Sequence, residues 1–339
     1  MSDKKIRVAI NGFGRIGRAA FRIILDKHKD IEIVAINDLA DSKTLAHLLK
    51  YDSVYGQFNG EISSEDKKII VNGQVFNVLS KTDPGNLPWE KLEVDVVLEC
   101  TGVFRKIEEV SRHISAGAKK VIISAPSKSK QVGVYVIGVN DNEIPQDVQI
   151  ISNASCTTNC ISPIMKVLED SFGVEKSFMT TVHSYTADQN LVDGPHKSGD
   201  LRRARGAAMN MVPTTTGAAL AATQTIPTLK DKFDGLAVRV PTAVGSIADI
   251  TAVLKKDVDV DAINNALISA SKSENMKNVL AVTEDPIVSS DIIGNSNSAI
   301  VDLALTKVVG NNLVKIIAWY DNEWGYSNRL VELVGKLMM

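Results

Sequence analysis

The chain has little of several features that mark particular classes of protein. Its 339 residues include only three cysteines, too few and odd in number for a disulfide framework, so a reducing compartment is favoured over secretion. No apolar run approaches the ~20 residues that cross a bilayer. The start, Met-Ser-Asp-Lys-Lys, leads into a strand-like segment rather than into the apolar stretch of a signal peptide. We therefore expect a cytoplasmic protein without a membrane span.

A strong charge of either sign is also missing. The 38 lysines and arginines nearly balance the 40 aspartates and glutamates, which leaves a net charge of -2 and no basic field for nucleic acid or anionic membrane. With 44% hydrophobic and 23% charged residues, the composition is that of an ordinary globular protein. Small-molecule partners are therefore expected, and the length predicts two domains.

The first half of the chain alternates between apolar runs and helical periodicity. A helical stripe over residues 19–24 and a helical stretch over residues 106–116 lie between the runs. The runs expected to be strands cover residues 6–10, 31–36, 94–98, 121–124 and 134–139. This alternation predicts a mostly parallel sheet covered on both faces.

A glycine motif follows the first of these runs. Gly12, Gly14 and Gly17 form Gly-x-Gly-x-x-Gly between a strand and a helix, and Asp38 closes the next strand 21 residues after Gly17. Such glycines allow a tight turn, close approach to a pyrophosphate and close helix packing, and the carboxylate binds ribose hydroxyls while repelling a 2'-phosphate. The pattern predicts NAD rather than NADP, and the alternative is an ordinary tight connection.

Three further loops follow predicted strands. They are Thr101-Gly102, Ser124-Ala125-Pro126 and Asn153 to Ser155. Open sheets of this kind bind ligands at the carboxyl ends of their strands. The alternative is that these loops are simple connections rich in turn-forming residues.

Cys156 stands where a helical stripe begins, and the stripe ends at Gly173. Backbone amides and the positive end of the helix dipole favour a thiolate at such a place. The competing interpretation is a small buried hydrophobic residue, which is how we interpret Cys160. The four-residue spacing of the two thiols and the lack of a second cysteine pair make zinc improbable, so we predict no metal site.

Three other polar features stand out further along. His183 ends a strand-like run 27 residues after Cys156, and a histidine beside a thiol raises its nucleophilicity and accepts protons, although many histidines on strands are simply structural. Arg239 interrupts an apolar strand, which requires an anion or a carboxylate as partner. Residues 213–217, Pro-Thr-Thr-Thr-Gly, predict a helix start with donors for an anion.

The second half predicts a largely antiparallel or mixed sheet. Alternating runs cover residues 236–240, 247–254, 300–306 and 314–320, with a helix at 260–271. A final stripe over residues 330–337 predicts a helix that packs on the first domain.

Six motifs together resemble those of one family, the phosphorylating glyceraldehyde-3-phosphate dehydrogenases, from end to end of the chain. They are Asn-Gly-Phe-Gly-Arg-Ile-Gly-Arg (11–18), Ser-Asn-Ala-Ser-Cys-Thr-Thr-Asn-Cys (152–160), His-Ser-Tyr-Thr (183–186), Pro-Thr-Thr-Thr-Gly (213–217), Arg-Val-Pro-Thr (239–242) and Trp-Tyr-Asp-Asn-Glu-Trp-Gly-Tyr-Ser (319–327). The resemblance implies a Rossmann-type doubly wound parallel sheet domain plus an α+β catalytic domain with a largely antiparallel or mixed sheet. It places an NAD-binding domain at 1–155, a catalytic and substrate-binding domain at 156–321 and a returning C-terminal helix at 322–339.

The resemblance also implies a reaction and its residues. Cys156 would attack glyceraldehyde 3-phosphate, His183 would act as base during NAD reduction, and inorganic phosphate would release 1,3-bisphosphoglycerate from the thioester. A homotetramer is implied as well. By the family pattern, Thr186 and Arg239 bind the substrate phosphate. The attacking phosphate would contact Ser155, Thr157, Arg203, Thr216 and Gly217, and the cofactor would contact Arg15, Ile16, Asp38, Thr101, Ser124 and Asn322.

Three alternatives remain beside this interpretation. An enzyme of the same superfamily that oxidises erythrose 4-phosphate would share the thiol and the histidine. A cysteine hydrolase built on Cys156 and His183 would have no use for the glycine motif. A nucleotide-binding protein without catalysis would need neither the thiol nor two anion sites.

Overall fold

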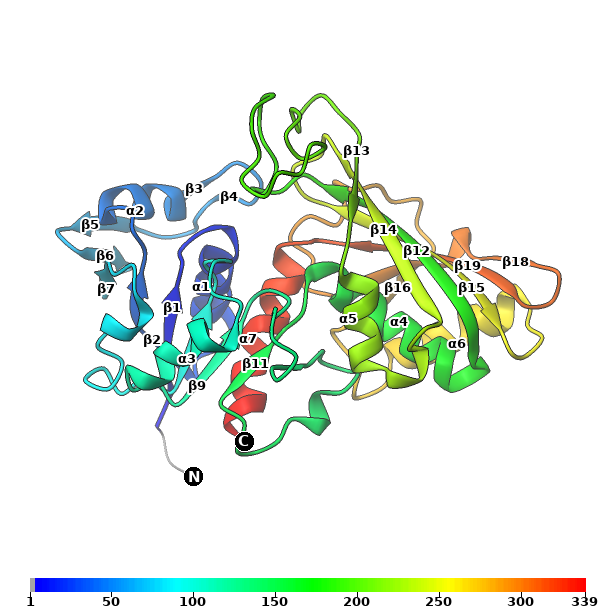
Figure 1. Cartoon of the computed structure of the whole chain (residues 1–339), viewed down its shortest axis with the longest axis horizontal. Coiled ribbons are helices and arrows are strands. Elements are labelled where there is room, and N and C mark those ends of the chain that lie inside the picture. The colour runs from blue at the N-terminus through cyan, green and yellow to red at the C-terminus, as the bar shows by residue number, and fades with distance from the viewer. Residues whose placement is uncertain (1–3) are drawn as a thin grey trace. The chain divides into compact units, whose positions relative to one another are not determined.

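The computed structural model describes residues 4–339, which form two compact units. The first unit contains the chain up to Tyr135, Asp141–Ala154 and Ser327–Met339, and the second contains Val136–Asn140 and Ser155–Tyr326. Each unit is built around its own sheet (Figure 1). Across residues 4–339, no helix combines the length and the apolar character that a membrane crossing requires.

The sheet of the first unit has nine strands in the order β10-β11-β9-β8-β1-β2-β7-β6-β5. Neighbours from β10 to β7 are parallel, and β7, β6 and β5 are antiparallel. The strands are β1 (Ile6–Asn11), β2 (Ile31–Asn37), β5 (Ile62–Glu65), β6 (Lys68–Val71), β7 (Gln74–Leu79), β8 (Val96–Glu99), β9 (Lys120–Ile123), β10 (Gly133–Val134) and β11 (Ile150–Ser152). A separate pair is formed by β3 (Tyr51–Asp52) and β4 (Gly56–Gln57).

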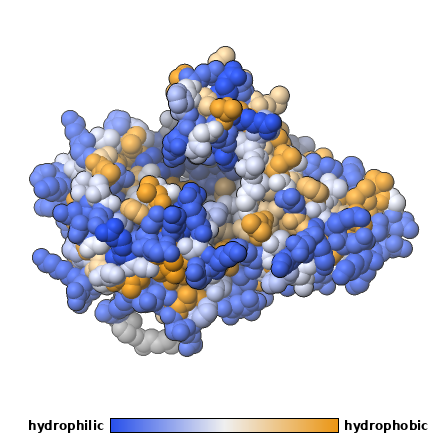
Figure 2. Space-filling model, in the orientation of Figure 1, coloured by the Kyte–Doolittle hydropathy of each residue, from blue (hydrophilic) through white to orange (hydrophobic). Residues whose placement is uncertain are grey.

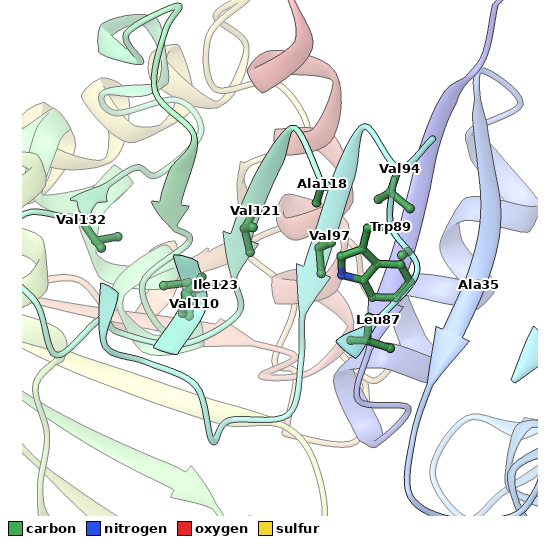
Figure 3. Packing of buried hydrophobic residues seen from close by; sticks show 11 residues of the cluster. Ala35, Leu87, Trp89, Val94, Val97, Val110, Ala118, Val121, Ile123 and Val132 are labelled. Atoms are coloured by element: carbon green, nitrogen blue, oxygen red, sulfur yellow. The ribbon is translucent and has the colours of Figure 1, made fainter. Parts of the chain in front are cut away.

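Helices connect these strands. The sequence predicts α1 (Arg15–Lys27) and α3 (Ile107–Ser115) but not α2 (Ser42–Lys50). Short 3-10 turns lie at η1 (Pro84–Asn86) and η2 (Asp141–Glu143). All four residues of β8 are buried, which requires cover on both faces of the sheet. On one face Val97 and Val121 pack with Val110 of α3 and with Trp89 in a single core cluster (Figure 3).

The strand order reverses between β1 and β8. From β1 the chain proceeds outward to β2, and from β8 it proceeds outward in the other direction to β9 and β11. In open sheets of this kind a crevice forms outside the carboxyl ends of the strands at such a reversal. The loops after β1 and β8 both begin there.

The predicted strand at 134–139 is wrong beyond Val134. Residues 136–140 instead form a turn, in which the amides of Val139 and Asn140 donate to the carbonyl of Val136 at 3.1 and 3.2 Å. The Asn140 side chain accepts from the Val136 amide at 2.9 Å, and Gly138 has a φ of 81°. An apolar run thus becomes a buried turn because a glycine and an asparagine side chain satisfy its backbone.

The second unit contains a mixed sheet of eight strands in the order β13-β14-β12-β15-β19-β17-β16, with β18 also paired to β19. The pairs β12 with β14 and β16 with β17 are parallel, and the other pairs are antiparallel. The strands are β12 (Val174–Ser184), β13 (Val212–Thr215), β14 (Phe233–Val240), β15 (Ser246–Leu254), β16 (Leu280–Thr283), β17 (Ala299–Asp302), β18 (Lys307–Val309) and β19 (Leu313–Tyr320). A mostly parallel sheet in one unit and a mixed sheet in the other confirm the predicted fold class.

The helices of the second unit are α4 (Cys156–Phe172), α5 (Ala218–Thr225) and α6 (Val260–Ser271), with 3-10 turns at η3 (Pro227–Leu229) and η4 (Leu303–Leu305). The last helix, α7 (Trp324–Met338), continues into the first unit, where Lys336 pairs with Asp141 at 2.9 Å.

Two predicted elements of this unit are wrong in detail. The run at 300–306 is a strand only to Asp302, because the next residues close a 3-10 turn with the Thr306 amide donating to Leu303. Residues 213–215 extend an edge strand rather than starting a helix, and α5 begins at Ala218. Proline is tolerated on an edge strand because no ladder bond is lost there.

One face of the second sheet is covered by helices and the other is open. Along β12, Met179 and Thr181 are buried, and Ser177 on the same face touches Met165 of α4. The alternate residues Phe178 and Val182 are 64% and 37% exposed. Because strand side chains alternate, His183 lies on the face covered by α4.

Candidate active site

The thiol of Cys156 lies at the first residue of α4, as the sequence predicts. Ser155 is the N-cap, and its hydroxyl accepts from the Thr158 amide at 3.1 Å and contacts the Thr158 hydroxyl at 2.8 Å. Cys156 is partly exposed, whereas Cys160 one turn later is buried. Cys156 is therefore the more accessible of the two residues.

His183 meets this thiol from the end of β12. Its Nε2 lies 3.4 Å from Cys156 Sγ, and its Nδ1 lies 2.7 Å from the carbonyl oxygen of Ser184. Arg239 also lies 3.2 Å from Nδ1, but the Ser184 carbonyl, which only accepts, makes the shorter contact. Nδ1 is therefore assigned the proton, and the lone pair of Nε2 faces the sulfur. The pair is thus set for transfer of a proton from Sγ to Nε2.

The environment of the pair acts on both of its titrating groups. Burial lowers the pKa of His183 to about 3, and the Arg239 guanidinium acts in the same direction. Burial raises the pKa of the Cys156 thiol, against the opposing effect of Arg239 and of the Thr157 donors. The prediction of a thiolate considered only the helix terminus. Burial thus favours the thiol and the neutral imidazole in this pair, so that Nε2 is available as a base.

Tyr320 lies behind the pair. Its hydroxyl contacts those of Thr157 at 2.9 Å and Thr181 at 2.8 Å, and its ring meets the His183 ring edge to face with centroids 5.9 Å apart. This buried contact holds β19, β12 and the start of α4 together. Sequence analysis missed Tyr320, although it lies within the motif at 319–327.

Arg239 lies beside His183 because the two residues are partners in the parallel pair β12 and β14. Its guanidinium donates to the Thr186 hydroxyl at 2.9 Å and to the Ser184 carbonyl at 3.1 Å, and Thr186 in turn donates to Asp188. In place of the predicted anion or carboxylate, the guanidinium of Arg239 thus has a hydroxyl and a carbonyl as its hydrogen-bond partners here. The structure brings Arg239 and Thr186 together at the edge of His183.

A second group of predicted residues gathers around the starts of α4 and α5. The Thr158 hydroxyl donates to the Ala218 carbonyl at 3.4 Å, which joins the two helix starts. Gly217 is the N-cap of α5, and the Thr216 hydroxyl accepts from the Ala218 amide at 3.2 Å. These two helix starts present backbone amides in one region, which suits an anion.

Arg203 reaches the same region from a preceding loop. Its guanidinium donates to the Thr215 carbonyl at 3.4 Å and pairs with Asp200 at 3.0 Å and Asp188 at 3.3 Å. Two carboxylates thus hold the guanidinium of Arg203. Sequence analysis missed both, and no pattern in the loop distinguishes them from ordinary exposed acids.

The first unit carries a pocket of about 370 Å³ at the reversal of strand order. Its walls come from the loops after β1, β2, β7 and β8. The lining residues are Asn11, Gly12, Gly14, Asn37, Asp38, Leu39, Lys81, Thr82, Cys100, Thr101, Val103 and Phe104. Four predicted cofactor residues, Gly12, Gly14, Asp38 and Thr101, thus come together.

The three glycines of the motif differ in what surrounds them. Gly12 has a φ of 92°, and a Cβ on Gly17 would stand 2.1 Å from the Gly12 carbonyl oxygen. A Cβ on Gly14 would meet nothing within 4 Å. Gly12 therefore makes the turn, Gly17 allows α1 to approach it, and Gly14 leaves open space in the pocket. Asp38 accepts from the Phe13 amide at 2.7 Å, which joins the loops after β1 and β2.

Other predicted cofactor residues lie elsewhere. Arg15 forms an ion pair with Asp52 and lies over the Tyr55 ring. Among the described residues, neither Ile16 nor Ser124 belongs to the pocket lining. The side chain of Ser124 forms a hydrogen bond with the Cys100 thiol. Asn322 belongs to the second unit, where its side-chain oxygen accepts from the Ser246 hydroxyl at 2.9 Å and the Gly245 amide at 3.2 Å.

Comparison with known proteins decides the family. A family model described as the NAD binding domain of glyceraldehyde 3-phosphate dehydrogenase matches residues 6–107, and one described as the C-terminal domain matches residues 155–322. The chain belongs to the glyceraldehyde-3-phosphate dehydrogenase family. Members of this family with the same name resemble the whole chain. The protein from Streptomyces coelicolor is 52% identical over 329 residues, covering 97% of both chains.

Two further bacterial members of the family show the same extent of similarity. The glyceraldehyde-3-phosphate dehydrogenase of Borreliella burgdorferi is 52% identical over 339 residues, covering 98% of this chain and 100% of its own. That of Geobacillus stearothermophilus is 51% identical over 333 residues, covering 98% of both. The likeness therefore extends over both units, in agreement with the resemblance that the sequence showed.

Proposed function

We propose that this protein oxidises D-glyceraldehyde 3-phosphate to 1,3-bisphosphoglycerate, with NAD as oxidant and inorganic phosphate as second substrate, in glycolysis and gluconeogenesis. The observation that carries the proposal is the partly exposed Cys156 thiol at a helix start, 3.4 Å from the unprotonated Nε2 of His183. The family membership supports the substrate and the cofactor.

The residues of the pocket fit a dinucleotide. Gly14 leaves the space that a diphosphate needs at the start of α1, and Asp38 presents a carboxylate at the end of β2. We assign NAD to Gly12, Gly14, Gly17, Asp38 and Thr101. By family pattern Arg15, Ile16, Ser124 and Asn322 complete the set, although Arg15 and Asn322 are held by protein partners in this structure.

The chemistry begins with Cys156. Its thiol passes a proton to His183 Nε2 while Sγ bonds to the aldehyde carbon, and the carbonyl oxygen then takes that proton from Nε2 to give a thiohemiacetal. The amide at the start of α4 donates to that oxygen as charge develops on it. His183 Nε2 then accepts the hydroxyl proton as the carbon loses hydride, which leaves a thioester on Cys156. NAD supplies the hydride acceptor. A phosphate oxygen finally attacks the thioester carbon and the Cys156 sulfur leaves.

Two anion sites hold the phosphates. Arg239 and Thr186, next to His183, would bind the substrate phosphate. Arg239 offers charged donors at that edge, and the Thr186 hydroxyl would donate to the phosphate in place of Asp188. The attacking phosphate would bind where α4 and α5 start, with Ser155, Thr157, Arg203, Thr216 and Gly217 as its contacts. Arg203 would exchange a carboxylate partner for the phosphate when it binds.

We further propose the domain boundaries 1–155, 156–321 and 322–339, a cytoplasmic location and a homotetramer. Three free thiols suit a reducing compartment. The open face of the second sheet suits a second copy of the chain, because Phe178 is 64% exposed and Leu236 on the adjacent strand is 45% exposed. Apolar side chains also lie on the projection at the top of Figure 2. In the segment between β12 and β13, Leu191, Met209 and Met211 are each at least 75% exposed.

The function is tested by following the absorbance of NADH with purified protein. Glyceraldehyde 3-phosphate is compared with erythrose 4-phosphate, NAD with NADP, and each with and without inorganic phosphate. We expect phosphate-dependent turnover with glyceraldehyde 3-phosphate and NAD, and a relaxed preference against NADP in Asp38→Gly. Faster turnover of erythrose 4-phosphate would assign the protein to the other branch of the superfamily.

A further inference from the structure

A row of buried polar side chains crosses the sheet of the first unit below the pocket. Glu99, Asn11 and Asn37 are the last residues of the adjacent strands β8, β1 and β2, and the strand register places them side by side. All three are at most 5% exposed. Asn11 Nδ2 donates to Glu99 Oε2 at 2.5 Å, and Asn37 Nδ2 donates to Asn11 Oδ1 at 2.7 Å.

Each end of the row holds a loop that lines the pocket. Asn37 accepts from the Lys81 amide and donates to the Lys81 carbonyl, both at 2.9 Å. At the other end, Glu99 Oε1 accepts from the Thr101 amide at 2.9 Å and from the Thr101 hydroxyl. Asn11, Asn37, Lys81 and Thr101 all line the pocket, whereas Glu99 does not.

The direction of the hydrogen bonds shows why position 99 carries a carboxylate. Trp89 Nε1 only donates, and it lies 2.9 Å from His113 Nδ1, so the ring proton of neutral His113 is on Nε2. That nitrogen lies 3.1 Å from Glu99 Oε2 and donates to it. Glu99 is therefore surrounded by donors alone, from Asn11, Thr101 and His113, which only an ionised carboxylate satisfies on both oxygens.

An ionised side chain that is 1% exposed is costly unless its partners compensate for lost hydration. None of the catalytic steps above uses Glu99, and an apolar residue would serve a merely packed core better. The cost is explained if the carboxylate fixes the loops that receive a ligand.

We propose that Glu99 is a positioning residue for the cofactor. Its carboxylate orients the Asn11 amide and the Thr101 loop, and through Asn11 and Asn37 it fixes the loop at Lys81, so that the floor of the pocket is formed before NAD arrives. The hydrogen bond from Trp89 to His113 Nδ1 keeps the ring proton of His113 on Nε2, which faces Glu99. This inference rests on the assignment of the pocket to NAD.

The variant Glu99→Gln keeps the size of the side chain and places an amide donor against donors. The dissociation constant of NAD, measured by calorimetry on the purified protein, should rise about tenfold, the effect of losing one hydrogen bond to a charged group. The KM for NAD should rise with it, while kcat at saturating NAD stays within about threefold because no catalytic contact changes.

Asp95→Asn is the matched control. Asp95 is another buried carboxylate directly before β8, at the opposite end of that strand, where it accepts from the Arg7 amide at 2.9 Å and from Lys119 at 2.7 Å. Both variants should lower the melting temperature, since each alters a buried, hydrogen-bonded carboxylate. Asp95→Asn should leave the dissociation constant of NAD unchanged. Equal weakening of NAD binding in both variants would reduce Glu99 to a structural residue and overturn the inference.

Two more variants keep the test decisive. His113→Phe removes only one donor from Glu99 and should weaken NAD binding by a smaller factor. If Glu99→Gln does not fold, an unchanged dissociation constant of NAD in His113→Phe overturns the inference.

Asp38→Gly tests the assignment of the pocket to NAD. If it leaves the binding of NAD and NADP unchanged, the assignment of the pocket fails; if it alters them while Glu99→Gln does not, only the role of Glu99 fails.

Discussion

At the scale of single residues, the three cysteines differ through their surroundings rather than their chemistry. Cys156 is partly exposed beside a histidine that can take its proton, and Cys160 is 0% exposed. Burial, together with the neighbouring carboxylate of Glu99, raises the pKa of the Cys100 thiol to about 12. Because His183 can take the proton of Cys156 as the sulfur reacts, Cys156 should be the nucleophilic thiol at neutral pH.

This difference predicts the outcome of alkylation. Iodoacetamide at neutral pH should label Cys156 alone, as located by peptide mass spectrometry, and labelling of Cys100 should appear only as the pH approaches 12. Cys156→Ser is the control and should take no label at neutral pH. Labelling of Cys100 or Cys160 at the rate of Cys156 would show that the surroundings do not select the thiol.

At the scale of elements, Gly17 and Gly14 serve different purposes where β1 leads into α1. Gly17→Ala should lower the free energy of unfolding by about 1–3 kcal/mol, because its Cβ would overlap the Gly12 carbonyl and α1 must move. Gly14→Ala should change it by less than about 0.5 kcal/mol, since the added Cβ meets open space. Urea unfolding measures both.

The binding of NAD separates the same two variants in another way. Gly14 lines the pocket, so the Cβ of Gly14→Ala occupies space assigned to the diphosphate, and NAD affinity should fall in a protein of unchanged stability. Normal NAD affinity in Gly14→Ala would place the diphosphate elsewhere.

Elements with regular periodicity were predictable from the sequence, and those that depend on distant partners were not. The stripe after Cys156 predicted α4 and its end at Gly173, and apolar runs predicted the parallel strands. The run at 134–139 failed because Asn140 and Gly138 form a turn that periodicity does not detect.

The same distinction holds for the candidate site. The cysteine motif and the glycine motif are local, so their residues could be named in advance. Tyr320 meets Thr157 across 163 positions of sequence, and Glu99 meets Asn11 across 88. Such contacts follow from the order and register of strands, which a single sequence does not reveal.

At the scale of the whole molecule, the open face of the second sheet predicts self-association. Phe178→Glu places a charge on that face and should lower the assembly mass measured by light scattering, because a buried unpaired charge disfavours an apolar interface. Val75→Glu, at a residue 51% exposed on β7 of the first unit, is the control and should keep the native mass. An unchanged mass in Phe178→Glu would exclude this face as an interface.

The formation of a thioester on Cys156 is tested most directly by omitting phosphate. Enzyme mixed with glyceraldehyde 3-phosphate and NAD alone should form NADH in an amount equal to the enzyme and then stop. Mass spectrometry should locate a phosphoglyceroyl group on Cys156, which disappears when phosphate is added. An adduct on another residue, or continued NADH formation by Cys156→Ser, would contradict the mechanism.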